Sequence, residues 1–283
     1  MSRLKVSELF YSIQGEGRYM GVPSVFLRTF GCNFTCDGFN MPAGEKSNER
    51  NVIANNAGEI KVYKELPLVS TGCDSYASWD VRFKHLSPML SMDAVVDGIM
   101  DVLPFNEWKD EHLVITGGEP LLGWQRAYPE LLSHARMDAL KELTFETNGT
   151  QPLSDDLYEF LSEWTFARND YSDLTFSVSP KLSASGESWD DAIKPEVVSK
   201  YSAVGYTYLK FVISNLDHLI EAETAVEAYR DYGFDGPVYL MPVGGTSEVY
   251  NMNNRQVAEY AMVKGWRYSD RLQVPLFKNE WGT

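Results

Sequence analysis

Strand-like and helix-like segments alternate along this chain from about residue 91 onward. Segment 92–100 carries apolar side chains at helical spacing after Ser91, a good helix N-cap, and the apolar run 113–115 follows it. A strand at 143–145 and a helix after Ser154 repeat the same order. Because a helix between two strands normally returns the chain to run parallel beside the first strand, this alternation predicts a parallel sheet.

Other segments extend the same pattern. Further strands are expected at 25–27, 174–178, 208–213, 238–240 and 272–274, and further helices near 217–232 and 254–264. Gly233 and Gly265 stand where helix C-caps belong. About six or seven strands separated by helices predict an α/β fold whose mostly parallel sheet is open or forms a partial (β/α) barrel. In such a fold, the loops after the strands hold the active site.

Residues 37–72 interrupt this alternation. Pro42, Gly44, Gly58 and several asparagines lie there without a sustained period, so we expect an insertion or long loop of irregular structure. So long a loop in a compact domain is usually functional or partly disordered. With 283 residues, the chain is long enough for one large domain or two small ones.

Composition excludes several classes of partner. The chain has 40 acidic and 25 basic residues and a formal net charge of -15, so the phosphate field of a nucleic acid would repel it. It contains no run of about 18 apolar residues, and its N-terminal stretch lacks the apolar segment of a signal peptide. We therefore expect a cytoplasmic protein that binds neither a nucleic acid directly nor a membrane.

The three cysteines of the chain suggest a metal site. Cys32 and Cys36 follow the strand at 25–27, and Cys73 lies in a similar Gly-containing loop. Three cysteines in an unexported chain cannot pair off, which favours ligand or redox chemistry. Thiolates suit an iron–sulfur cluster or zinc, and three of them would leave one iron of a cluster open to a small molecule. A zinc site completed by a histidine, or three buried thiols without a role, are the alternatives.

A second motif follows the strand at 113–115. It reads Thr-Gly-Gly-Glu-Pro over residues 116–120. Paired glycines let the backbone approach a ligand closely, and the carboxylate after them could accept hydrogen bonds from an ammonium group. A tight turn is the plainer interpretation of this string alone. Here the string occurs at a strand end and after a set of cysteines, and this combination is much rarer than either motif alone.

Together, the Cys-x-x-x-Cys pair, the later cysteine and the Gly-Gly-Glu-Pro string resemble the radical S-adenosylmethionine superfamily. The closer resemblance is to the 7-carboxy-7-deazaguanine synthase family of the queuosine and deazaguanine pathways. Matching segments lie at 10–17, 26–28, 31–33, 73–75, 116–121, 145–149 and 179–183. The most specific are Ser-Ile-Gln-Gly-Glu-Gly at 12–17 and Ser-Pro-Lys-Leu-Ser at 179–183.

The resemblance implies an activity and its cofactors. It implies a carbon–nitrogen lyase that holds a [4Fe–4S] cluster on Cys32, Cys36 and Cys73, cleaves S-adenosylmethionine reductively and requires Mg²⁺. The resulting radical would convert 6-carboxy-5,6,7,8-tetrahydropterin to 7-carboxy-7-deazaguanine with loss of ammonia. The resemblance further implies a single domain, 1–283, with the insertion at about 37–72 inside the cluster-binding loop, a flavodoxin-like electron donor and a homodimer.

Site residues carry over from the family one by one. The S-adenosylmethionine contacts implied are Gly117, Gly118, Glu119, Thr147, Asn148, Ser179 and Lys181. The substrate contacts implied are Gln14, Glu16, Arg28, Asp74, Thr116, Gly118, Glu146 and Gln273. Arg28 suits a carboxylate because its guanidinium forms a fork, although a solvated strand residue is the alternative. Ser75 is implied as the Mg²⁺ ligand through its hydroxyl. Turn chemistry is the alternative role for the residues at 147–148 and 179–181.

The chain departs from the family pattern in three places. Thirty-six residues separate Cys36 from Cys73 where most relatives have two, and Cys73 is identified by the sequence at 74–80 after it. Ser75 replaces the threonine of relatives, and Gln273 stands where the family often has histidine, so it cannot carry charge.

Two other functions remain open at this point. One is a radical activase, or another radical enzyme acting on a different substrate, although no further ferredoxin-like cysteines are present. The other is a non-catalytic metal-binding interaction protein that kept the fold.

Overall fold

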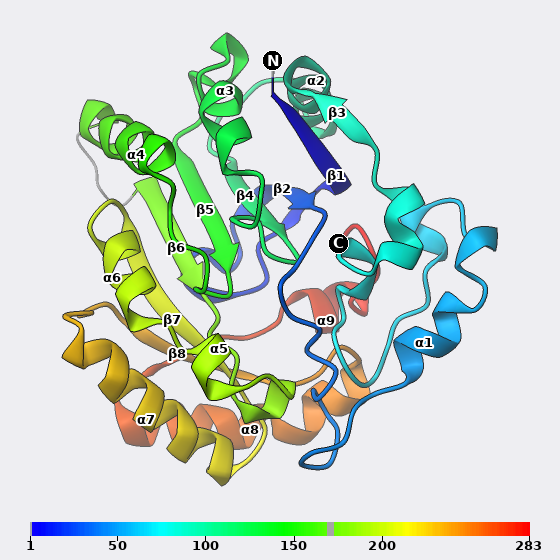
Figure 1. The fold of residues 1–283 in the computed structure, drawn as a ribbon, viewed down its shortest axis with the longest axis vertical. Coiled ribbons are helices and arrows are strands. Elements are labelled where there is room, and N and C mark those ends of the chain that lie inside the picture. The colour runs from blue at the N-terminus through cyan, green and yellow to red at the C-terminus, as the bar shows by residue number, and fades with distance from the viewer. Residues whose placement is uncertain (1, 169–172) are drawn as a thin grey trace.

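The computed structural model describes residues 2–168 and 173–283, which form a nine-stranded sheet in the order β3-β1-β2-β4-β5-β6-β7-β8-β9 (Figure 1). The strands are β1 Arg3–Ile13, β2 Pro23–Thr29, β3 Met89–Ser91, β4 His112–Gly117, β5 Glu142–Thr147, β6 Leu174–Val178, β7 Tyr206–Ile213, β8 Val238–Pro242 and β9 Arg267–Tyr268. Neighbours from β2 to β9 run parallel, whereas β1 is antiparallel to both β2 and β3. The expected α/β fold with a mostly parallel, open sheet is confirmed.

Helices follow most of the strands and cover the outside of the curved sheet (Figure 1). They are α1 Glu49–Ala54, α2 Met92–Val102, α3 Tyr128–Leu132, α4 Asp155–Arg168, α5 Trp189–Ala192, α6 Pro195–Ser202, α7 Leu216–Asp231, α8 Ser247–Lys264 and α9 Gln273–Phe277. Strands β6 and β8 are buried along their whole length, as expected for strands covered on both faces. Each helix of the described residues is too short or too polar to span a bilayer.

Aromatic rings tie the core between sheet and helices together. Phe145 of β5 stacks on Phe176 of β6 at 5.6 Å between ring centroids, and Phe176 stacks on Tyr201 of α6 at 4.7 Å. Tyr128 of α3 meets Phe145 edge-on at 5.3 Å. Each of these side chains is fully buried, so consecutive strands and their covering helices share one continuous core.

The register of the parallel strands determines where the site can form. Arg28 of β2 pairs with Thr116 of β4, and Glu146 of β5 pairs with Ser177 of β6. These pairs lie at or near the carboxyl ends of their strands, and the loops that follow emerge at the same edge of the sheet.

Several helix ends agree with the sequence. The Ser91 hydroxyl accepts a hydrogen bond from the amide of Ala94 at 3.3 Å and caps α2. Gly265 caps α8 with φ of 66°, and Gly233 follows α7 with φ of 86°. The helix expected near 254–264 starts earlier, at Ser247.

Two sequence expectations need correction. The strand expected at 272–274 is wrong, because α9 begins at Gln273 and the last strand is β9 at 267–268. Three apolar or polar residues in alternation are too few to distinguish a strand from a helical turn. Strand β1 was missed, and Gln14 and Glu16 lie in the loop that follows it.

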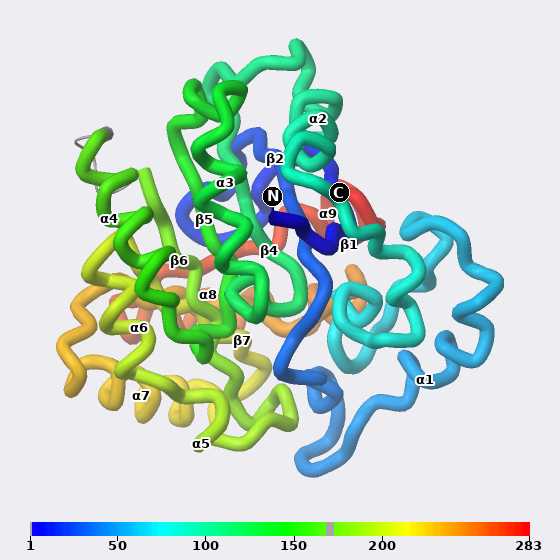
Figure 2. The backbone as a smooth tube through the Cα atoms, turned by 45° about the horizontal axis from the view of Figure 1, so that its top comes forward, coloured from blue at the N-terminus to red at the C-terminus, as the bar shows by residue number. Residues whose placement is uncertain are grey.

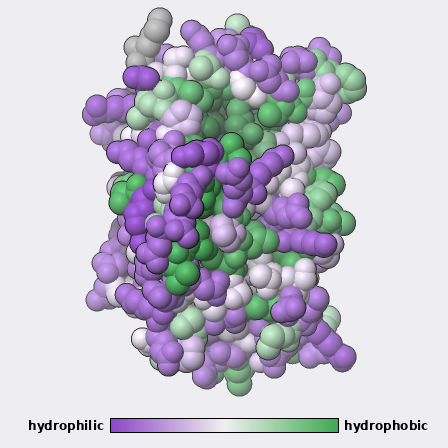
Figure 3. Space-filling view, turned by 90° about the vertical axis from the view of Figure 1, so that its right-hand side faces the viewer, coloured by the Kyte–Doolittle hydropathy of each residue, from purple (hydrophilic) through white to green (hydrophobic). Residues whose placement is uncertain are grey.

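The insertion at 37–72 is largely irregular, as expected, but it has a core of its own. It contains α1 and short 3-10 turns, and its chain stands out from the side of the molecule (Figure 2). A small buried cluster joins it to the segment after Cys73, through Ala57, Tyr63, Leu66, Val69, Tyr76, Ala77 and Phe83. On this side of the molecule, hydrophobic side chains form small groups between hydrophilic ones (Figure 3). The insertion is therefore packed against the body through a defined contact.

We expect Phe83→Ala to lower the free energy of unfolding by about 3–5 kcal/mol, because Phe83 is fully buried and its ring lies 5.2 Å from that of Tyr76. The measurement is urea unfolding of the purified protein. Val81→Ala is the control, since Val81 is 73% exposed, and it should change the free energy by about 0.5 kcal/mol or less. Equal effects of the two substitutions would show that this cluster does not stabilise the fold.

Candidate active site

A cavity of about 280 Å³ opens at the carboxyl edge of the sheet. Residues from the ends of β2, β4, β5, β6, β7 and β8 line it, as do the loop after β1 and the C-terminal segment. All three cysteines contribute to the lining, and Cys32, Cys36 and Cys73 pack together with Phe34, Phe39 and Ala192. The structure therefore brings the predicted metal ligands into the same cavity as the strand-end residues.

The loop that carries Cys32 and Cys36 is held by the segment after β6. The Glu187 carboxylate accepts hydrogen bonds from the amides of Thr35 at 2.9 Å and Cys36 at 2.8 Å. The amide of Gly38 donates to the carbonyl of Ser185 at 2.9 Å. A side chain at Gly38 would come within 2.5 Å of the Gly186 nitrogen, so the close approach of these two loops requires glycine there.

N–H groups point at the sulfurs of Cys32 and Cys73. The amide of Phe34 donates to Cys32 Sγ, and the indole Nε1 of Trp79 donates to Cys73 Sγ, each at 3.4 Å. Burial raises the pKa of Cys32 to about 12 and that of Cys73 to about 11. Without a bound cation these groups would stay thiols at neutral pH, so the site gains its thiolates together with a metal.

Three soft thiolates are a donor set that an iron–sulfur cluster accepts, whereas a zinc site would need a further ligand. Within residues 2–168 and 173–283, no three Cys, His, Asp or Glu side chains gather as the ligands of one metal ion would. The described lining of the cavity also contains no histidine to complete a zinc site. In a [4Fe–4S] cluster each thiolate binds a different iron, so its ligands stand farther apart than those of one ion.

Paired glycines allow the loop after β4 to lie against the cysteine loop. A side chain at Gly117, whose φ is 153°, would come within 2.3 Å of the Thr29 carbonyl oxygen. One at Gly118 would meet the Gly31 carbonyl oxygen at 2.4 Å and the Cys32 Cβ at 2.6 Å. Since both glycines also line the cavity, the backbone here is exposed to a ligand on its other side.

The side chain of Glu119 is buried behind the cavity wall, and its expected contact with S-adenosylmethionine stays a prediction. Glu119 is fully buried and is absent from the described residues that line the cavity. Its carboxylate accepts hydrogen bonds from the amide of Leu121 at 3.0 Å, the Thr147 hydroxyl at 2.8 Å and the amide of Asn148 at 2.7 Å. Burial raises the pKa of Glu119 to about 7. Its carboxylate thus joins the turns after β4 and β5, and a sequence motif cannot show which way a side chain turns.

The other residues expected at S-adenosylmethionine line the cavity. They are Gly117, Gly118, Thr147, Asn148, Ser179 and Lys181. The Lys181 ammonium donates to the Ser179 hydroxyl at 3.2 Å, and the Asn148 amide donates to Asn33 at 2.9 Å. These polar groups lie beside the cysteine loop at the ends of β4, β5 and β6.

A buried charge network also lines the cavity. The Glu16 carboxylate accepts hydrogen bonds from Lys210 at 2.5 Å, Arg271 at 3.1 Å and Gln273 at 2.7 Å. Burial raises the pKa of Glu16, but Lys210 and Arg271 outweigh it and lower the value to about 2. Arg271 also pairs with Asp74 at 2.7 Å and donates to the Gly244 carbonyl. Both cations line the cavity, and neither was predicted as a site residue.

Arg28 and Gln14 are oriented by carboxylates. Arg28 Nε donates to Glu8 at 2.9 Å, and its other end donates to the Ser75 hydroxyl at 3.2 Å. The Gln14 amide donates to Glu146 at 3.0 Å. All five side chains line the cavity. Arg28 is therefore held in place with one end of its guanidinium at Ser75.

Gln273 has an unused acceptor. Its amide nitrogen donates to Glu16, while its Oε1 is buried without a hydrogen-bond partner among the described residues. A side chain at Gly15 would come within 1.8 Å of this oxygen, so Gly15 permits the approach. Because an unpaired buried acceptor is costly, a ligand N–H at this position would be favoured.

No family model matches the chain. A 7-carboxy-7-deazaguanine synthase of Halobacterium salinarum is 33% identical over an alignment that covers 98% of this chain and 91% of the relative. The chain belongs to the 7-carboxy-7-deazaguanine synthase family. A synthase of the same name from Pyrobaculum aerophilum is 29% identical, and the alignment covers 99% of this chain and 97% of the relative. The crystal structure of QueE from Escherichia coli has the same fold, with a TM-score of 0.52, 19% sequence identity, and coverage of 94% of this chain and 93% of that one.

Membership of this family makes the chain an enzyme of the radical S-adenosylmethionine type. Of the site residues expected from the sequence, the cavity gathers all except Glu119. Sequence reasoning missed Glu8, Lys210, Arg271 and Glu187. Glu8 and Lys210 could have been found as charged residues inside strands, Lys210 in the apolar strand 206–213. A buried charge needs a partner, so such residues indicate an ion pair or a site. No local pattern marked Glu187, whose partners lie about 150 residues earlier in the chain.

We expect Glu187→Ala to weaken metal retention, because the amides of Thr35 and Cys36 lose their common acceptor. The measurement is iron bound per chain after anaerobic reconstitution and gel filtration, which should fall several-fold. Glu45→Ala is the control, since Glu45 is an exposed residue of the insertion. Unchanged iron content in Glu187→Ala would exclude a role for this carboxylate in holding the cysteine loop.

We expect Glu16→Gln to lower the free energy of unfolding at pH 7 by about 3 kcal/mol, because two buried cations lose their partner. The folded-state pKa of Glu16, about 2, lies below its ordinary value of 4.5. The stabilisation is therefore complete above pH 4.5 and is lost as pH falls toward 2, so the difference between the two proteins should shrink over that window.

Urea unfolding at a series of pH values measures this difference. Glu163→Gln, at an exposed position of α4, is the control and should match the wild type throughout. A gap between Glu16→Gln and wild type that stays constant from pH 5 to pH 2 would contradict the ion-pair account.

Proposed function

We propose that this chain converts 6-carboxy-5,6,7,8-tetrahydropterin to 7-carboxy-7-deazaguanine with loss of ammonia, using a [4Fe–4S] cluster on Cys32, Cys36 and Cys73. The observation that carries the proposal is the convergence of three thiols and a dense set of polar strand-end groups on one cavity. Family membership supports the reaction, since relatives that align along nearly the whole chain bear that synthase's name.

The cavity has two ends with different chemistry. When bound, the cluster and S-adenosylmethionine supply the one-electron chemistry that starts the reaction. At this end the chain offers the backbone of Gly117 and Gly118 and the side chains of Asn148, Ser179 and Lys181 to bind and orient the cofactor. These groups would set which substrate atom lies next to the cofactor, which is the main task of a protein that leaves hard chemistry to its cofactors.

Substrate recognition falls to the charged end. The guanidinium of Arg28, held through Nε by Glu8, suits the substrate carboxylate. Glu16, Glu146 and Gln273 present carboxylate and amide oxygens of the kind that read N–H groups on a pterin ring. The free acceptor of Gln273 supports its assignment, because a ring N–H would satisfy it. Thr116, Gln14 and Asp74 complete the proposed contacts.

The side chains around Ser75 offer few ligands for Mg²⁺. The Ser75 hydroxyl lies 3.2 Å from the Arg28 guanidinium, and the neighbouring Asp74 is paired with Arg271. Mg²⁺ needs about six oxygen ligands and commonly takes several from water and substrate. We therefore expect the ion to bind at Ser75 only together with the substrate carboxylate.

The insertion and the C-terminal segment would exclude water. Leu68, Val69 and Ser70 of the insertion line the cavity, as do residues 279–283. Trp281 packs against Tyr63 and Tyr76 at 5.6 and 5.7 Å between ring centroids, so the two segments support each other. We propose that the insertion at 37–72 of this single-domain chain covers the cavity mouth. A flavodoxin-like electron donor, a homodimer and a cytoplasmic location accompany the proposal as expectations from the family.

The deciding test is anaerobic reconstitution with iron and sulfide, then incubation with a reductant, S-adenosylmethionine, Mg²⁺ and 6-carboxytetrahydropterin. Mass spectrometry should find 5′-deoxyadenosine together with 7-carboxy-7-deazaguanine, and both should vanish in Cys73→Ala, which removes one cluster ligand. Full turnover by Cys73→Ala would overturn the cluster assignment. Deoxyadenosine without the deazaguanine would overturn the substrate, and a protein that binds one zinc and no S-adenosylmethionine would favour a binding protein.

A further inference from the structure

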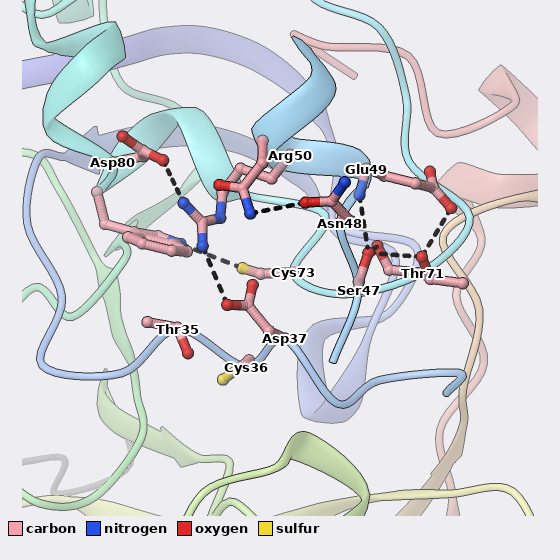
Figure 4. A network of polar contacts seen from close by, with 12 residues as sticks. Thr35, Cys36, Asp37, Ser47, Asn48, Glu49, Arg50, Thr71, Cys73 and Asp80 are labelled. Carbon is pink, nitrogen blue, oxygen red and sulfur yellow. Dashed lines mark hydrogen bonds and ion pairs between the residues drawn. The ribbon is translucent and has the colours of Figure 1, made fainter. Parts of the chain in front are cut away.

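Arg50 of the insertion joins the chain segment after Cys36 to the chain segment after Cys73. Its guanidinium donates to Asp37 at 3.0 Å and to Asp80 at 2.5 Å (Figure 4). Asp37 follows Cys36 directly, and Asp80 comes shortly after Cys73. One side chain from α1 thus bridges both sides of the long gap between the cysteines.

The same guanidinium lies over the ring of Trp79. The distance from its central carbon to the ring centroid is 4.6 Å, which is the geometry of a cation–π contact. The indole N–H of Trp79 donates to Cys73 Sγ at 3.4 Å. A continuous set of contacts therefore runs from the insertion to a cluster ligand, with Trp79 as its middle member.

Backbone contacts keep this arrangement closed. The amide of Gly72 donates to the Phe39 carbonyl at 2.8 Å, and the amide of Ser47 donates to the Asp37 carbonyl at 2.7 Å. Glu49, next to Arg50, accepts from the amide of Ser70 at 2.8 Å. The two ends of the insertion therefore lie side by side, so Arg50 is presented from a closed loop and not from a free one.

The hydrogen bond from the Trp79 indole to Cys73 Sγ would affect the reduction potential of a bound cluster. An N–H donor aimed at a ligand sulfur stabilises the more negative, reduced form of a cluster, and hydrogen bonds of this kind are among the features that set reduction potentials. Arg50 is only partly exposed, at 15% of its side chain, and is paired with two carboxylates, so it can hold the indole in a fixed orientation.

We propose that Arg50 is a positioning residue of the insertion that acts through Trp79 on Cys73 and thereby raises the reduction potential of the cluster. This inference rests on the proposed function, because it requires a cluster on Cys73. It assigns to the insertion a role in adjusting the cluster in addition to covering the cavity.

The test is an EPR-monitored redox titration of the anaerobically reconstituted protein, without S-adenosylmethionine, read as the midpoint potential of the one-electron couple. Trp79→Phe keeps a ring under Arg50 but removes the N–H, and we expect a more negative potential. Arg50→Gln should shift the potential in the same direction by no more than Trp79→Phe does. The double variant should match Trp79→Phe alone, because Arg50 acts through that indole.

Arg82→Gln is the matched control. Arg82 also pairs with Asp80, at 2.5 Å, but its side chain is 38% exposed, and it should leave the potential at the wild-type value. A wild-type potential in Arg50→Gln, or shifts that add in the double variant, would overturn the inference. If Arg50→Gln retains no cluster, Arg50→Lys replaces it, since lysine keeps the charge but not the planar two-carboxylate bridge. Failure of the wild-type protein to load iron would instead contradict the proposed function.

Discussion

Parallel pairing from β2 to β8 is the constraint on which the rest of the molecule depends. It sends the loops after these strands to one edge of the sheet, where the cysteine loop, the glycine pair and the turn at Asn148 meet. Had one of these strands been reversed, its loop would have emerged at the opposite edge. The same register also buries the strands on both faces, which makes the scaffold rigid enough to present fixed groups to a cofactor.

Charge pairing across the cavity complements this scaffold. Glu16 follows β1, near one side of the open sheet, whereas Lys210 lies in β7 and Arg271 follows β9 near the other. These ion pairs join flanks that no ladder of strand hydrogen bonds connects within the described residues. Buried charges of this kind contribute little net stability, but removing one partner is costly, so the network fixes the geometry of this part of the cavity.

The insertion shows how a departure from a family pattern can be accommodated. Thirty-six residues between Cys36 and Cys73 would leave Cys73 on a flexible loop if they were unstructured. Here a small apolar cluster and the contacts of Arg50 return the chain to Cys73. Glu187 holds Cys36 in place by accepting a hydrogen bond from its backbone amide. The cysteine loop is thus supported by segments from distant parts of the chain.

Local patterns in the sequence determined much of this protein. Periodicity predicted strands β2 and β4 to β8 and helices α2, α4, α7 and α8, and the family resemblance of short motifs predicted the cysteines, the glycine pair and other polar residues of the cavity. The strand expected at 272–274 failed because three residues do not define a period, and β1 was missed. Tertiary structure alone decided that Glu119 turns inward and that Lys210, Arg271, Glu187 and Arg50 support the site. The physical reason is that most of these side chains have partners far along the chain. Lys210 and its partner Glu16, for example, are separated by 194 residues. Such pairings follow from the packing of the whole chain and not from neighbouring residues in the sequence.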